Sequence, residues 1–326
     1  MTIQREHLDQ SSSVNLNNLL IANLPIYPVT DLPIIIVSWN VRDLLVRCLT
    51  SLQVELERSQ IAGRVIVVDN ASHDGSPDMV RERFPQVELI ASDENLGFAR
   101  GNNLALRKVL DSEFALLLNP DTEVQSGAIA TLLAAAQTRS DIAVATSRLF
   151  YGDGAFQHSA FRFPGLSQLY IDLFPVPGRL YESRLNGRYP RRWYEAEQPF
   201  EIDHPLGAVM LIRGAAMRQV GLFDENFALY CEEIDWAARF KEAGWRNVCV
   251  PAARITHHEG RSTSQVKVAS FVKLWTARYQ LHTKHPQFAP LALARLIVTQ
   301  GMKRKLRGAS PEMQAACEKI IGVWNQ

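Results

Sequence analysis

The sequence of 326 residues has only four cysteines, and none of them belongs to a Cys-x-x-Cys pair. This excludes a disulfide-stapled scaffold and the usual structural zinc sites. Cys48, Cys231, Cys249 and Cys317 each lie among apolar residues, which predicts buried free thiols in a reducing compartment. No stretch approaches the roughly 20 apolar residues of a membrane span, and the polar N-terminus lacks the apolar core of a secretory signal. We therefore expect a cytoplasmic protein.

Two common phosphate-binding patterns are also absent. The sequence contains neither Gly-x-Gly-x-x-Gly nor a P-loop, so dinucleotide and ATP-type sites lose their usual support. The sequence has enough apolar residues for a hydrophobic core, because 47% of the residues are hydrophobic and 21% are charged. This balance excludes a wholly disordered chain and predicts one large domain or two smaller ones.

The net charge of +1 hides an uneven distribution. Residues 261–326 carry eleven Lys or Arg against two Asp or Glu, whereas residues 1–260 carry 24 against 32. In the basic tail an apolar stretch precedes the cluster from Lys303 to Arg307. This combination fits a peripheral contact with an anionic membrane at the inner face of the plasma membrane. A solvated closing helix with a charged end explains it at least as well. No nucleic-acid partner is expected.

Short apolar runs alternate with helical patterns along most of the chain. Strands are predicted at 33–38, 64–69, 87–91, 114–118, 142–146, 207–212 and 246–250. This alternation favours an α/β fold with a Rossmann-like, mostly parallel central sheet, helices on both faces, and C-terminal helices. Ligands of such sheets bind where the strands end.

Three regions are expected along the chain. Residues 1–30 read as a flexible N-terminal arm, residues 31–262 as one domain, and residues 263–326 as a basic helical extension. Residues 150–205 interrupt the regular pattern with many Pro, Gly, Arg and aromatic residues. They form either an excursion packed by its own aromatic rings or a substrate-facing insertion.

Polar residues follow two of the predicted strands. Asp69 ends one strand, and Asn119-Pro120-Asp121 follows another. Carboxylates at this edge can hold a divalent cation or accept hydrogen bonds from a ligand. Both segments are also good turn sequences, so these residues alone leave the choice open.

Three further segments carry candidate chemistry. The segment 95–103 joins a strand to a helix, and its glycines would permit close approach of an anion. Glu232, Glu233 and Asp235 crowd the start of a predicted helix, where acids favour the helix dipole. Crowding also raises carboxyl pKa values, which suits a general base. The pair His257-His258 could complete a metal shell, or it could be an ordinary surface pair.

The order of these segments resembles that of glycosyltransferase family 2, in particular its rhamnosyltransferase-like branch. The resemblance covers about residues 32–285. The matching motifs are Ile36-Val37-Ser38-Trp39-Asn40, Val67-Val68-Asp69-Asn70-Ala71-Ser72, Asn95-Leu96-Gly97-Phe98 with Gly101-Asn102-Asn103, Leu118-Asn119-Pro120-Asp121-Thr122, Gly207-Ala208 through Arg213, Gly221-Leu222-Phe223-Asp224-Glu225 with Tyr230-Cys231-Glu232-Glu233-Ile234-Asp235, and His257-His258-Glu259-Gly260-Arg261-Ser262.

The resemblance implies an A-type glycosyltransferase fold and an inverting transfer in cell-surface polysaccharide synthesis. The donor would be a nucleotide-diphosphate sugar, with dTDP-L-rhamnose as the best candidate, and the acceptor a saccharide or lipid-linked glycan. Residues 31–148 would form the nucleotide-binding half, and residues 149–262 the acceptor and catalytic half. Mg²⁺ or Mn²⁺ would be the cofactor of this transfer.

Individual roles follow from the same resemblance. The residues that would bind the nucleotide sugar are Ser38, Asn40, Asp69, Asn95, Gly97, Asn102, Asn119 and Asp121. Asp121 and His257 would hold the metal ion. Glu233 would be the catalytic base, with Glu232 and Asp235 beside it.

Two departures from the family pattern stand out. Asn119 replaces the first acid of Asp-x-Asp, and Glu232-Glu233 replaces the usual Glu-Asp, which leaves open which carboxylate is the base. Alternatives are a UDP-hexose or UDP-galactofuranose donor, or a non-catalytic relic that binds sugar nucleotides. A nucleotidyltransferase would carry a basic glycine-rich loop after its first strand, where this chain has Trp39-Asn40-Val41-Arg42.

Overall fold

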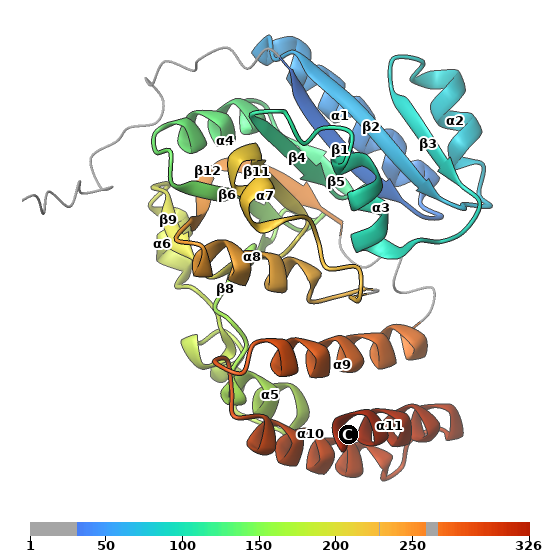
Figure 1. The fold of residues 1–326 in the computed structure, drawn as a ribbon, viewed down its shortest axis with the longest axis vertical. Helices are drawn as coiled ribbons and strands as arrows, with labels where there is room; N and C mark the ends of the chain where they lie inside the picture. The colour runs from blue at the N-terminus through green and yellow to red at the C-terminus, as the bar shows by residue number, and fades with distance from the viewer. Residues whose placement is uncertain (1–30, 228, 259–266) are drawn as a thin grey trace, which may run out of the picture.

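A computed structural model describes residues 31–227, 229–258 and 267–326 (Figure 1). The predicted N-terminal arm, the boundary expected at residue 262, and Glu259-Gly260-Arg261-Ser262 of the last motif lie outside the described residues. The four cysteines are all buried free thiols, as predicted.

A ten-stranded mixed sheet forms the centre of the protein. Eight strands follow the order β3-β2-β1-β4-β11-β6-β12-β5, while β7 pairs with β6 and β9 pairs with β12. Six of the eight run in one direction, and β11 and β5 run against them. The predicted mostly parallel sheet is confirmed. The strands are β1 (Leu32–Ser38), β2 (Gly63–Asn70), β3 (Glu88–Ser92), β4 (Phe114–Leu118), β5 (Thr122–Val124), β6 (Ile142–Phe150), β7 (Phe156–Gln157), β9 (Phe200–Ile202), β11 (Val209–Arg213) and β12 (Arg246–His257).

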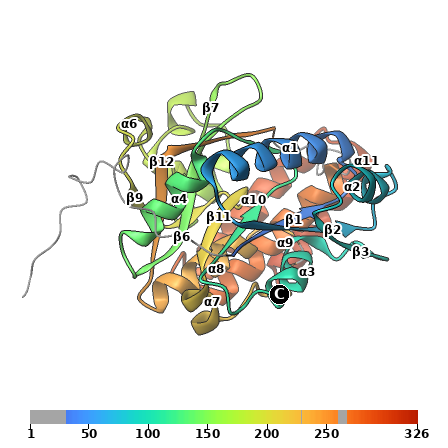
Figure 2. The same cartoon turned by 90° about the horizontal axis from the view of Figure 1, so that it is seen from above.

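Helices cover both faces of this sheet (Figure 2). One core cluster joins the sheet to α1 (Arg42–Ser59), α2 (Ser76–Arg83) and α4 (Ala128–Gln137). The other joins it to α3 (Gly97–Leu106), α7 (Gly214–Val220) and α8 (Glu232–Glu242). Along β1, Ile34 and Ile36 belong to the first cluster and Ile35 to the second. This is the period of two that a strand buried on both faces requires.

The chain between β6 and β11 is an excursion packed largely by its own aromatic rings. It contains a two-stranded sheet of β8 (Ala160–Phe161) and β10 (His204–Pro205), together with α5 (Leu166–Leu173), η3 (Gly178–Leu180), η4 (Arg184–Asn186) and α6 (Arg191–Glu195). The Tyr194 side chain is fully buried, and its hydroxyl bonds the backbone N–H and carbonyl of Ala160 at 3.2 and 3.3 Å.

The basic extension is a packed helical unit. It comprises α9 (Lys267–Lys284), α10 (Leu291–Leu306) and α11 (Pro311–Trp324), which form a third core with α5. The Trp324 indole is fully buried and donates a hydrogen bond to the Trp275 carbonyl at 2.9 Å. None of the helices in the described residues combines the length and hydrophobicity that a membrane span requires.

Candidate active site

Two buried polar side chains lie together where β1 and β2 end. Ser38 and Asp69 are direct neighbours in the parallel register of these strands. Asp69 Oδ2 accepts a hydrogen bond from the Ser72 N–H at 2.9 Å, but Asp69 Oδ1 and Ser38 Oγ have no partner among the described residues. Buried polar atoms are costly when unpaired, so this pair fits a hydrogen-bonding ligand.

Asn40 holds the turn after β1 against the turn after β2. Its backbone adopts a left-handed φ of 51°. Its N–H donates to Ser72 Oγ at 2.9 Å, and its Oδ1 accepts from the His73 N–H at 2.8 Å. The structure therefore gives Asn40 a part in shaping the Asp69 edge.

The loop before α3 is fixed against β2. Asn95 Oδ1 accepts from the Gly97 N–H at 3.0 Å, and Asn70 Nδ2 donates to the Gly97 carbonyl at 3.1 Å. Gly97 has a φ of 75°, which glycine adopts without strain. Asn102 is buried and donates to the Phe98 carbonyl within the same helix. Asn95 and Gly97 thus border the Asp69 edge, whereas the Asn102 amide is engaged inside α3.

Asp121 and His257 meet at the end of β12. His257 pairs in register with Thr122, and both Asp121 and His257 are buried. His257 Nε2 lies 3.3 Å from Asp121 Oδ1, yet this oxygen has no hydrogen-bond partner among the described residues. His257 Nδ1 lies 3.1 Å from the Oε1 of Gln157. A carbonyl oxygen accepts, so Nδ1 carries the proton and donates.

This arrangement fits a cation. With the proton on Nδ1, a neutral His257 presents a lone pair to a carboxylate, and only a proton or a metal ion makes that approach favourable. An outer hydrogen bond that fixes the tautomer is also typical of metal-binding histidines. Within the described residues, no group of three or more His, Cys, Asp or Glu side chains could hold a metal ion. Asp121 and His257 therefore offer two ligands, and a bound substrate or water would supply the rest.

The start of α8 holds two carboxylates with raised pKa values. Tyr230 and Cys231 precede the helix in left-handed conformations, with φ of 72° and 68°. Glu232 is buried and its Oε2 has no partner in the described structure. Burial and the neighbouring Glu233 charge raise the pKa of Glu232 well above its usual range. Burial raises the pKa of Glu233 to about 7.

A glycine brings the Glu233 side chain close to the sheet. A Cβ atom on Gly207 would lie 3.3 Å from Glu233 Cγ, and Gly207 has a φ of 90°. The next residue, Ala208, accepts a hydrogen bond from the Asn119 N–H at 2.9 Å. The acids of α8 are thus connected through two residues to the Asn119–Asp121 turn.

Asp235 has a different environment from its two acidic neighbours. The side chain is fully buried, with Arg239 Nε 2.9 Å from Oδ2 and both His285 Nε2 and Lys284 Nζ within 2.8 Å of Oδ1. Burial acts to raise the pKa of Asp235, but the hydrogen bonds from His285 and Lys284 and the Arg239 charge lower it to about 2. Both oxygens are occupied, so the carboxylate ties α8 to the end of α9.

Sequence reasoning missed three contacts that shape this site. They are the Gln157 bond to His257, the approach of Gly207 to Glu233, and the contact of the Cys48 thiol with the Asn119 carbonyl at 3.6 Å. Gln157 lies 100 residues from His257 on a two-residue strand. No periodic pattern marks such a position.

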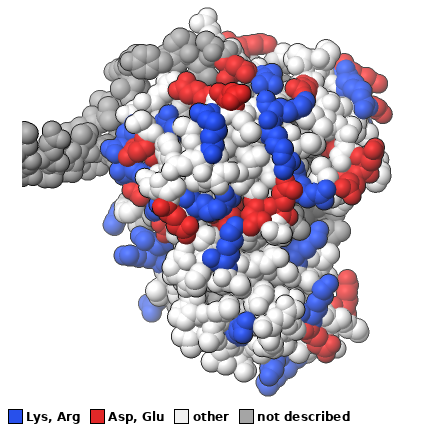
Figure 3. Space-filling model, in the orientation of Figure 1, with Lys and Arg blue, Asp and Glu red and all other residues white. Residues whose placement is uncertain are grey.

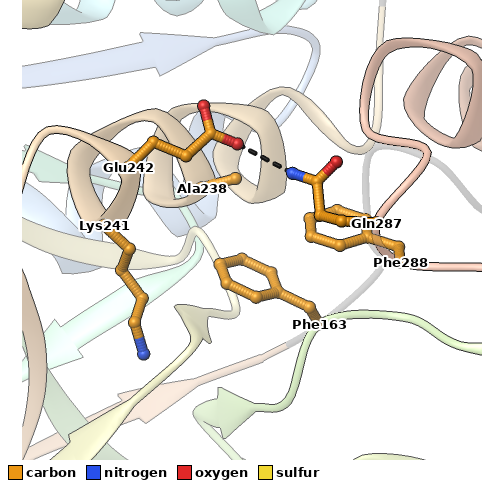
Figure 4. Close-up of a pocket in the computed structure, with 6 residues that line it drawn as sticks. All are labelled: Phe163, Ala238, Lys241, Glu242, Gln287 and Phe288. Atoms are coloured by element: carbon orange, nitrogen blue, oxygen red, sulfur yellow. Dashed lines mark hydrogen bonds between the residues drawn. The ribbon is translucent and has the colours of Figure 1, made fainter.

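A pocket of about 480 Å³ lies along the far part of α8 (Figure 4). Phe163, Ala238, Lys241, Glu242, Gln287 and Phe288 line it, and Gln287 donates to Glu242 at 2.8 Å across its edge. None of the predicted site residues lines this pocket. This pocket beside α8 is therefore separate from the Glu232–Glu233 pair.

Comparisons with known proteins agree with the motifs. Residues 34–207 match the profile of Glycosyl transferase family 2. The chain is 29% identical over 256 residues to N-acetylglucosaminyl-diphospho-decaprenol L-rhamnosyltransferase of Mycobacterium tuberculosis, covering 73% of this chain and 79% of that protein. It is 27% identical over 177 residues to rhamnosyltransferase WbbL of Escherichia coli K12, covering 51% and 63%.

A solved structure shows the same fold. Mannosyltransferase PcManGT from Pyrobaculum calidifontis, determined in complex with GDP-Man and Mn²⁺, superposes with a TM-score of 0.51. The sequences are 15% identical, and the match covers 93% of this chain and 74% of that one. The predicted A-type glycosyltransferase fold is confirmed.

The Asp235 contacts predict a pH-dependent contribution to stability. A folded-state pKa of about 2 stabilises the fold above the pKa of the unfolded carboxyl group, and this stabilisation is lost as the pH falls toward 2. Asp235→Asn should lower the free energy of unfolding by about 2 kcal/mol at pH 7 and by about half as much at pH 3. Urea unfolding of both proteins at the two pH values measures this. An equal loss of unfolding free energy at pH 7 and pH 3 would contradict a stabilising role for the charged Asp235 carboxylate.

Proposed function

The chain belongs to glycosyltransferase family 2, and from that premise we propose that it transfers a sugar, with inversion, to a hydroxyl of a saccharide or lipid-linked glycan. The best candidate for the donor is dTDP-L-rhamnose, which would supply L-rhamnose. The similarity to two rhamnosyltransferases supports this donor. The process served would be the synthesis of a cell-surface polysaccharide. A UDP-hexose or UDP-galactofuranose is the alternative donor.

One observation carries the catalytic proposal. Glu232 and Glu233 are adjacent carboxylates beside Gly207, and the pKa of Glu233 is raised to about 7. Two like charges on adjacent, poorly hydrated side chains do not ionise together easily. With Glu232 protonated, Glu233 can gain or lose a proton near neutral pH, which a general base must do. Glu233 would take the proton of the acceptor hydroxyl as its oxygen attacks the anomeric carbon. Asp235 would position α8.

The donor would bind along the strand ends. Ser38 Oγ and Asp69 Oδ1 would bond the nucleotide, with Asn40, Asn95 and Gly97 shaping that pocket. Asn119 would contact the sugar nucleotide beside Asp121. Asp121 and His257 would hold Mg²⁺ or Mn²⁺, which supplies positive charge against the leaving diphosphate. The Gln157 bond to Nδ1 would keep the His257 Nε2 lone pair directed at this position.

Removing the base should reduce turnover without loss of donor binding. Glu233→Gln should lower kcat by about 10²- to 10⁴-fold, the usual contribution of general-base catalysis. In the unaltered enzyme kcat should rise with pH through about 7, as Glu233 loses its proton, and this rise should be absent in the variant. Steady-state transfer assays from pH 5.5 to 8.5 measure both. Glu242→Gln, at the exposed end of the same helix, is the control. Near-normal turnover of Glu233→Gln would refute the assignment.

The donor and its metal can be tested together by calorimetry. With Mn²⁺ present, dTDP-L-rhamnose should bind more tightly than UDP-glucose or UDP-galactofuranose. Asp121→Ala should remove the gain in affinity that Mn²⁺ provides, so that titrations with Mn²⁺ and with EDTA agree. Asp93→Ala, which changes an exposed acid, should keep the gain. A metal effect that survives in Asp121→Ala would argue against this metal site.

We also propose a peripheral membrane contact through α10. Leu293 and Leu296 are 48% and 57% exposed, while Val298 on the same helix is buried in the third core. The exposed cluster Lys303-Arg304-Lys305 ends the helix. Figure 3 shows the C-terminal helical part as mostly uncharged surface with separate basic side chains and a few acidic ones. Basic residues near an anionic surface contribute about 1 kcal/mol each.

Point variants test this contact better than truncation, which would remove Trp324 from the core. Leu293→Ser with Leu296→Ser should reduce cosedimentation with phosphatidylglycerol vesicles at least fivefold, because two apolar side chains no longer enter the interface. Val54→Ser, which changes an equally exposed residue of α1, should have no effect. Unchanged cosedimentation of the double variant would contradict the proposal.

A further inference from the structure

A second pocket, of about 440 Å³, lies within the excursion between β6 and β11. Its lining includes Phe156 and Gln157 of β7, Phe161 of β8, Arg188, and Arg191 of α6. Apart from Gln157, which bonds His257, these residues have no part in the site described above. The pocket is therefore a separate space whose walls come from the chain that follows the nucleotide-binding half.

Two of the residues that line this pocket connect it to the candidate active site. Gln157 lines the pocket and also bonds His257, the partner of Asp121. Leu206, another lining residue, precedes Gly207, which packs against Glu233. The Leu206 N–H is held by the Ser159 carbonyl at 2.9 Å. A molecule with one end in this pocket can therefore extend toward the carboxylates of α8.

The pocket carries an excess of positive charge. The Arg188 guanidinium lies 4.6 Å from the centre of the Phe161 ring, and that of Arg191 lies 4.9 Å from the centre of Phe156. No carboxylate of the described residues lies within ion-pair distance of Arg188, and its Nε is buried without a partner there. Arg191 has Glu195 at 3.6 Å, but that pair is largely exposed and weak.

The one acid that lines the pocket is already engaged. Glu182 lies 2.9 Å from His158 Nε2, while His158 Nδ1 is buried with no partner in the described residues. The His158 side chain is only 9% exposed. Burial lowers its pKa, so the ring stays neutral and adds no positive charge to the pocket. The two guanidinium groups are therefore the groups that can bind an anion, and planar guanidinium groups held on aromatic rings suit the oxygens of a phosphate group.

We propose that this pocket binds the phosphate or diphosphate group of an anionic acceptor, whose reactive hydroxyl then lies at Glu233. The inference deepens the proposed function and rests on it. Arg188 is the principal contact, since it has no acidic partner, and Arg191 is an outer one. The Phe161 ring holds the Arg188 guanidinium in place, and the Phe156 ring holds that of Arg191.

Calorimetric titration with octyl diphosphate in the presence of EDTA tests the pocket without the metal site. The unaltered protein should bind the probe, and Arg188→Gln should weaken binding at least tenfold. Arg191→Gln should weaken it about threefold, and because that side chain is 64% exposed the variant should fold normally. Arg192→Gln, on the same helix but outside the pocket, is the matched control. Melting temperatures of all variants verify folding.

Two results would overturn the inference. Binding that is unchanged in both Arg188→Gln and Arg191→Gln would show that the pocket does not take the probe. Equally tight binding of inorganic pyrophosphate would assign the site to a free anion instead of an acceptor. The titration needs neither metal nor turnover, so it can fail while sugar transfer is confirmed, and it can succeed where transfer is not observed.

Discussion

The antiparallel pairing of β11 with β4 is the constraint on which the site depends. Because β11 runs against β4, its first residues lie where β4 ends, and the Asn119 N–H bonds the Ala208 carbonyl. This places Gly207 at the same edge, where its φ of 90° favours glycine and an added Cβ would crowd Glu233 Cγ at 3.3 Å. The strand that breaks the parallel pattern thereby joins the turn that carries Asp121 to the helix that carries Glu233, the proposed base.

The three acids at the start of α8 have pKa values that are shifted in opposite directions. Glu232 is buried and Glu233 beside it is partly buried, and loss of hydration raises the pKa of both. Asp235, two residues and so about half a turn beyond Glu233, is surrounded by His285, Lys284 and Arg239, and its pKa falls to about 2. The same helix therefore presents a proton acceptor to the sheet edge and a permanent anion to α9. Lys284 and His285 at the end of α9 thus hold α8 in place.

Much of the fold follows from the sequence because buried strands and amphipathic helices repeat with distinct periods. β1, β2 and β4 were predictable to within a residue at each end. β12 extends seven residues beyond the predicted end at Val250, because a register shift between Val250 and Arg254 accommodates Pro251 and the strand continues. That continuation buries His257 beside Asp121, so the interpretation of the histidines as a surface pair was wrong for His257. Its contact with Gln157 depends on tertiary structure alone.

The central claim is that a single carboxylate base at the start of α8 activates the acceptor for direct displacement at the anomeric carbon. The anomeric configuration of the product tests this claim most directly. NMR spectroscopy of the glycoside formed from the preferred donor gives that configuration through the one-bond carbon–hydrogen coupling of the new linkage. Direct displacement predicts the opposite configuration from that of the donor. A product with the donor's configuration would exclude a single in-line displacement and would contradict the account.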